Sequence, residues 1–178
     1  MTRGMEWTWM FKDDVGYYQN KVVRIDNVDF VLSTLWSHMP PEDEYVVLQR
    51  LNDFYQTMYD GHHIRVEDYN RMHQHCLDFI KKSVAESTAE HIVVVTHHLP
   101  SMLVVADRHR GSGLNSAFTT ELGDFIADSR IDAWIYGHSH TNVDAVIGNT
   151  KIVSNQMGYV FHNEHLTNGF ELDKFIEV

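Results

Sequence analysis

The chain has 178 residues, of which 43% are hydrophobic and 22% charged, so it can bury one core and we expect a single domain over residues 1–178. Its formal net charge of −11 argues against a nucleic-acid-coating protein, and no apolar run approaches the roughly 20 residues of a membrane span. The single cysteine excludes an internal disulfide and Cys-based zinc ribbons, and the start MTRGMEWTWM lacks a signal-peptide pattern, which together predict a cytoplasmic protein.

The first half of the chain predicts a hairpin, a long loop, a helix and a strand. Alternating β-branched and aromatic residues at 21–36 predict the hairpin, with its turn at Asp26-Asn27. Residues 37–65 predict a loop with a short helix. Apolar residues spaced by three and four predict an amphipathic helix over 66–86, in which Cys76 fills core space, and the run HIVVVT at 91–96 predicts a buried strand.

The second half continues with one helix and several strands. Residues 116–129 predict a helix capped by Asn115 or Ser116, and 131–136 predict another buried strand. Short strands are expected over 143–148, 150–155 and 172–178, the second entered through the Gly148-Asn149 turn. This order favours an α/β sandwich over a Rossmann sheet, and the sequence has no Gly-rich phosphate loop.

Histidines follow both buried strands: His97 and His98 in VVVTHHLP, and His138 and His140 in WIYGHSH. Because strand ends in α/β sheets carry ligand sites, we expect His97, His138 and His140 to lie within reach of a common ion or ion pair. Gly137 permits a sharp turn, and the spacing in an extended segment sends the last two rings to one side. They would bind one ion together or two ions in one pocket, or the turn merely caps a strand through hydrogen bonds.

Other polar residues are candidates for a supporting role. Trp36 and His38 end the hairpin and Asn52 lies in the long loop, so these three are candidates to line a substrate pocket rather than to serve ordinary turn chemistry. Three residues after the second histidine pair are candidates to hydrogen-bond and orient metal ligands: Asp144, Asn155 and Tyr159.

The motifs THHLP and YGHSHTN together resemble the last two motifs of the calcineurin-like metallophosphoesterases. The segments LNSAF and IGNTKIVSNQMGY resemble one bacterial branch of that superfamily, and the likeness covers roughly residues 17–178. The resemblance implies an α/β/β/α sandwich of two mixed sheets flanked by helices, with two divalent ions (Mn, Fe, Zn or Ni) at the strand ends. It implies that His97 and His138 bind one ion and His140 the other, with His98 as a catalytic residue beside them. A bridging hydroxide would attack the phosphorus of a small phosphorylated substrate, a monoester or a diester.

The family's earlier motifs, an Asp-x-His near the start, Gly-Asp-x-x-Asp and Gly-Asn-His followed by an acid, do not occur in this sequence. Asp13-Asp14 is not part of an Asp-x-His, and DGHH at 60–63 lies in a polar loop with no strand before it, so neither segment is taken as one of these motifs. We therefore expect the chain to correspond to the C-terminal two-thirds of such a domain, completed by an upstream or separate N-terminal segment or devoted to a role without catalysis. Alone it should hydrolyse phosphate esters near background and tend to form homo-oligomers. The alternatives are a non-catalytic interaction domain and a mononuclear three-histidine zinc hydrolase.

Overall fold

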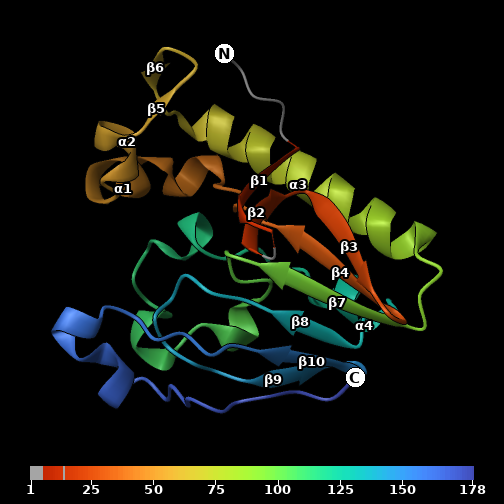
Figure 1. Ribbon diagram of the computed structural model, residues 1–178. Coiled ribbons are helices and arrows are strands. Elements are labelled where there is room, and N and C mark those ends of the chain that lie inside the picture. Colours follow the sequence, from red (N-terminus) through yellow and green to blue (C-terminus); the bar gives the residue numbers. More distant parts are fainter. Residues whose placement is uncertain (1–5, 14) are drawn as a thin grey trace.

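The computed structural model describes residues 6–13 and 15–178 and has a mixed α/β fold built on a six-stranded sheet (Figure 1). The strand order is β3-β4-β7-β8-β10-β9. Four strands run parallel at its centre: β4 (Val28–Ser33), β7 (His91–Thr96), β8 (Ala133–Ile135) and β10 (Thr150–Val153). The antiparallel strands β3 (Lys21–Ile25) and β9 (Ala145–Ile147) form its two edges.

One face of the sheet carries the main core. Val31, Val94, Trp134 and Ile152 lie in register across the four parallel strands, and all four are fully buried. The apolar face of α3 (Val66–Glu86) supplies Leu77, Ile80 and Val84 to the same cluster, and Figure 1 shows this helix running along the sheet. Strands at the centre of a parallel sheet are normally buried on both faces by other elements, which explains why these strands have continuous apolar sequences.

The opposite face of the sheet is also apolar but less covered. Leu32, Val95, Ile135 and Val153 are in register across the parallel strands, and each is only partly buried. The two faces of the sheet thus differ in how completely they are covered.

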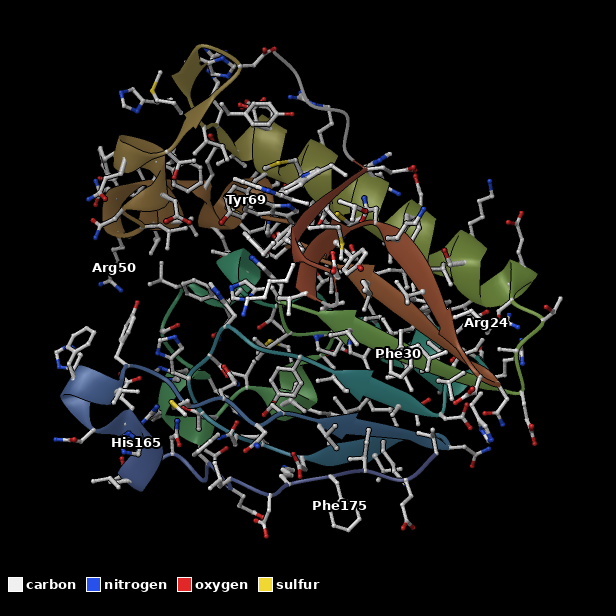
Figure 2. The ribbon with its side chains drawn as sticks, in the orientation of Figure 1. Arg24, Phe30, Arg50, Tyr69, His165 and Phe175 are labelled. Atoms are coloured by element: carbon white, nitrogen blue, oxygen red, sulfur yellow. The ribbon has the colours of Figure 1, made fainter. Side chains whose placement is uncertain are left out.

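Residues 37–65 are more regular than the predicted loop. They form α1 (Pro41–Arg50), α2 (Asp53–Gln56) and the two-residue strands β5 (Met58–Tyr59) and β6 (His62–His63). Val47 and Phe54 bury against a second core cluster that includes Tyr69 of α3, labelled in Figure 2. The hydroxyl of Tyr69 donates to Asp53 at 3.1 Å. Tertiary packing therefore gives this segment its helices.

The structure confirms the hairpin of β3 and β4, helix 66–86, strand 91–96 and the turn at Gly148-Asn149. A further hairpin, β1 (Trp7–Lys12) with β2 (Val15–Gln19), was not predicted. Residues 1–5 and Asp14 lie outside the described residues.

Two predicted elements are wrong. Helix 116–129 is reduced to the 3-10 turn η3 (Asn115–Ala117) and α4 (Gly123–Ala127), which is preceded by Leu122 rather than capped by Asn115 or Ser116. The Glu121 carboxylate accepts the backbone N–H groups of Met102 and Gly123, which holds this segment against the chain after β7. Residues 172–178 form no strand, because their contacts are side-chain bonds such as Lys174 to Asp144.

Within the described residues, none of the helices combines the length and the apolar character needed to cross a lipid bilayer.

The β9–β10 turn depends on Gly148, and we expect Gly148→Ala to destabilise the fold. Its φ is +60°, and an added Cβ would lie 2.9 Å from Cα of Ala127 and 3.0 Å from its carbonyl oxygen. Left-handed backbone costs a side chain about 1–2 kcal/mol, and the backbone clash adds to it, so the total loss should be about 2–4 kcal/mol. The control Gly113→Ala also has positive φ but meets only Val46 Cγ1 at 3.5 Å, so it should lose only about 1 kcal/mol. If urea unfolding showed that Gly148→Ala and Gly113→Ala lose the same free energy of unfolding, the close approach of Gly148 to Ala127 would be contradicted.

Candidate functional site

The two histidine motifs meet because β7 and β8 are adjacent and parallel. His97 follows β7 directly, and His138 lies shortly after the end of β8. The backbone N–H of Gly137 donates to the carbonyl oxygen of His97 at 3.1 Å, which joins the two loops beyond the strand ends. Figure 1 shows that the chain after β7 and the C-terminal turns (blue) lie at this same end of the sheet. The expectation that neighbouring strands bring these motifs together is confirmed.

His97 and His138 form a close pair of imidazoles. Nε2 of His97 and Nδ1 of His138 are 2.7 Å apart, and the rings meet edge to face with centroids 4.6 Å apart. Burial lowers the pKa of both rings, assisted by the charge of His140, and brings that of His138 to about 4. Both imidazoles are therefore neutral at neutral pH, which is the form that donates a lone pair to a metal ion.

The GHSH turn is not the extended segment that the sequence analysis assumed. His138 and His140 have φ values of 74° and 51°, whereas Gly137 is not in the left-handed region. The two rings consequently have different neighbours: His138 contacts Phe118, and His140 contacts Tyr159. Left-handed conformations at residues other than glycine are uncommon and concentrate at functional sites. The strain lies on the histidines themselves rather than on the glycine.

His140 is oriented by Glu164, a residue that the sequence analysis missed. Nδ1 of His140 lies 2.9 Å from Oε2 of Glu164, and the same oxygen accepts the backbone N–H of Tyr159 at 2.7 Å. The Tyr159 N–H and the His140 ring lower the pKa of Glu164. The carboxylate favours a proton on Nδ1 and leaves the Nε2 lone pair free, as in carboxylate-oriented metal ligands. The only sequence signal for Glu164 was an acid near two histidines in the C-terminal segment.

Of the three residues predicted to orient the metal ligands, one contacts the histidine site and two bond elsewhere. Asp144 bonds to Lys174 at 2.6 Å and accepts from the backbone N–H of Ser154 at 3.2 Å, so the carboxylate that pairs with His140 is Glu164 instead. Asn155 exchanges hydrogen bonds with the backbone of Glu171, away from the histidines. Tyr159 does support the site, through its ring on His140 and its backbone N–H on Glu164.

The histidines open onto a cavity of about 630 Å³. His97, His138 and His140 all line it, although the last two rings have different neighbours. The other lining residues mix apolar, aromatic, neutral polar and basic side chains with one carboxylate: Leu99, Val105, Ala106, Arg108, His109, Asn115, Phe118, Thr119, Ser139, Tyr159 and Glu164.

His98, the predicted catalytic residue, is not among the lining residues. It is only 2% exposed and stacks on His138 with ring centroids 4.6 Å apart and planes 10° apart. Burial lowers its pKa well below the usual value. Trp36 also packs on His98, with ring centroids 5.6 Å apart, so His98 supports His138 from within the protein.

His38 and Asn52 lie outside the histidine cavity. His38 is exposed and lines a neighbouring pocket together with Asn115 and Thr119, which belong to both. Asn52 is exposed at the start of α2 and contributes to neither pocket. None of the three predicted substrate-binding residues lines the histidine cavity, and His38 lines the pocket beside it.

A metal ion fits this donor set only in part. Over residues 6–13 and 15–178, no three His, Cys, Asp or Glu side chains are grouped as they stand in a way that would hold an ion. Two imidazole nitrogens bound to one tetrahedral ion at about 2.0–2.1 Å would be about 3.3 Å apart, so His97 and His138 need to separate only slightly. As they stand, these two nitrogens hydrogen-bond to each other, and His140 lines the same cavity.

Comparison with protein-family models finds no match. Among curated proteins, the chain is similar to "Uncharacterized protein L509" of Acanthamoeba polyphaga mimivirus, with 26% identity over 170 residues. This similarity covers 89% of the chain and 59% of that protein, so the chain spans about three-fifths of the relative's length. Among solved structures, it is similar to "GAP50 the anchor in the inner membrane complex of Plasmodium", with a TM-score of 0.37 and 14% identity over 84% of this chain and 36% of that one.

Proposed function

We propose that this chain carries the histidine part of a metal-dependent phosphoesterase of the calcineurin-like type. The observation that carries the proposal is the cavity at the ends of β7 and β8, which His97, His138 and His140 line together. The neutral imidazoles and the carboxylate behind His140 support a role in metal binding. The substrate would be a small phosphorylated molecule, either a monoester or a diester.

The fold belonging to this proposal is the α/β/β/α sandwich of two mixed sheets. Its support is the apolar row Leu32, Val95, Ile135 and Val153, which is only partly buried on the face away from the main core. Parallel sheets normally have both faces covered, so this row would pack against a second layer. A separate N-terminal segment or a second copy of the chain would provide that layer.

Each residue of the site has a defined task under this proposal. His97 and His138 hold one divalent ion, which when bound would polarise a phosphoryl oxygen and lower the pKa of a water molecule. Glu164 keeps the proton of His140 on Nδ1, so that Nε2 faces the site as an acceptor or ligand. His98 holds the plane of the His138 ring by stacking and is a positioning residue rather than a catalytic one.

Titration calorimetry with Zn²⁺ and Mn²⁺ on the full chain tests the proposal. His138→Ala should weaken metal binding by more than the 10- to 100-fold that loss of an orienting partner typically costs, because it removes a direct ligand. His63→Ala is the matched control, since His63 is an exposed histidine on β6 outside the cavity lining. The affinity of His63→Ala for Zn²⁺ and Mn²⁺ should equal that of the unmodified chain.

The number of ions bound tests the site further. One ion per chain is the result expected from the His97 and His138 pair, and two ions would show that this chain completes a dinuclear centre by itself. No binding, or binding that His138→Ala leaves unchanged, would contradict a metal site at these strand ends. Retention of the fold in each variant is checked by circular dichroism.

A further inference from the structure

Arg108 places a guanidinium beside the histidine turn. It lies in the 3-10 turn η2 (Asp107–His109) and lines the cavity. Its Nη2 donates to Oγ1 of Thr141, the residue that follows His140, and its Nε donates to Nε2 of His109 at 2.9 Å. These two bonds hold the guanidinium beside Thr141, at the end of the turn that carries His138 and His140.

The guanidinium retains hydrogen-bonding capacity for a ligand. Arginine has five N–H donors, of which these two bonds use two, so three remain. In the described part of the chain no carboxylate pairs with Arg108, whereas Arg110, two residues later, has Asp107 3.3 Å from its Nε. In a chain of net charge −11, Arg108 is a cation available to a bound anion.

The loop that carries Arg108 is tethered to the rest of the fold. Arg50, labelled in Figure 2, extends from α1, and its Nη1 donates to the carbonyl oxygen of Ser112 at 3.2 Å. Asn115 Nδ2 donates to the carbonyl oxygen of Arg110 at 2.8 Å. The loop therefore presents Arg108 from a defined position.

Part of the cavity lining is apolar. Val105 is 4% exposed, Ala106 follows it, and Phe118 packs on His138 with ring centroids 4.8 Å apart. A cavity of about 630 Å³ is in the range that takes small organic ligands and is much larger than one phosphate group needs. The space beyond the phosphate site is therefore suited to an apolar or aromatic group.

We propose that Arg108 binds the phosphoryl group of a small phosphate ester whose apolar or aromatic organic group packs on Val105 and Phe118. This rests on the proposed function and assigns its substrate class and its phosphate-binding residue. A planar guanidinium matches two phosphate oxygens at once, and its charge offsets that of the ester. The phosphorus is then held between Arg108 and the histidines.

Phenyl phosphate is the probe, and calorimetry on the full chain at neutral pH is the measurement, with and without Zn²⁺. Arg108→Ala should weaken phenyl phosphate binding by about 10- to 100-fold, as expected for a lost hydrogen bond to a charged group. Arg110→Ala, on the same exposed loop but outside the cavity lining, should change it by less than about 2-fold. Inorganic phosphate, which has no organic group, should bind more weakly than phenyl phosphate to the unmodified chain.

The outcomes separate this inference from the proposed function. Equal affinities of Arg108→Ala and Arg110→Ala for phenyl phosphate, or no binding by the unmodified chain, would overturn the role of Arg108. Equal affinities of phenyl and inorganic phosphate would overturn the apolar subsite. Arg108-dependent binding of phenyl phosphate without any binding of Zn²⁺ would support the anion site while contradicting the metal-dependent function. Zn²⁺ affinity itself should be unchanged in Arg108→Ala, which shows that the site stays intact.

Discussion

Lowering the pH from neutral to about 5 should reduce the free energy of unfolding by about 2 kcal/mol through His138 alone. Burial holds the folded-state pKa of this ring at about 4, below the ordinary value of 6.5. Between these two values the unfolded chain binds more protons than the folded chain, so stability falls as the pH falls. The stabilisation is complete above the unfolded pKa and is lost progressively toward the folded one. The lowered pKa values of His97 and His98 act in the same direction.

Urea unfolding between about pH 7.5 and pH 5 measures this effect, because the depressed pKa values of acids such as Asp29 and Asp68 act at lower pH. His98→Phe is the informative variant. It replaces a buried ring whose Nδ1 has no hydrogen-bond partner among the described residues with one of similar shape. The fall in stability over this pH range should become smaller in the variant. A stability independent of pH in the unmodified chain would contradict the buried neutral histidines.

Trp134→Ala should destabilise the fold by about 3–5 kcal/mol, the range seen when a large aromatic side chain is removed from a core. Trp134 is fully buried at the centre of β8, in the row that crosses the parallel strands. Its indole N–H donates to Oγ1 of Thr96 at 2.9 Å, and that hydroxyl donates to the carbonyl oxygen of His98 at 2.8 Å. The substitution therefore removes core volume and one link between the core and the histidine site.

Trp134→Phe separates these two contributions. It keeps most of the ring volume but loses the donor to Thr96, and a lost buried hydrogen bond costs about 1–3 kcal/mol. The free energy of unfolding of Trp134→Phe, measured by chemical denaturation, should therefore lie clearly between that of the unmodified chain and that of Trp134→Ala. A loss under about 1 kcal/mol for Trp134→Ala would mean that this row is not the centre of the core.

The sequence by itself determined the elements whose burial pattern is local and periodic. Spacing of three and four residues placed α3 at Val66–Glu86, and the continuous apolar run placed β7 at His91–Thr96. It also indicated that the histidines after the two strands would meet, because the ends of neighbouring parallel strands lie at one edge of a sheet. These patterns depend on which residues avoid water, and this can be read along the chain.

Only the tertiary structure decided which groups face those histidines. Glu164 rather than Asp144 pairs with His140, and Arg108 reaches Thr141, because segments far apart in sequence fold onto one loop. The left-handed backbone at His138 and His140 could not be predicted either, since residues other than glycine adopt it only rarely and an extended strand end was the more common alternative. Side-chain pairing across 24 to 33 residues depends on how the loops pack, and the periodicity of the sequence carries no information about that packing.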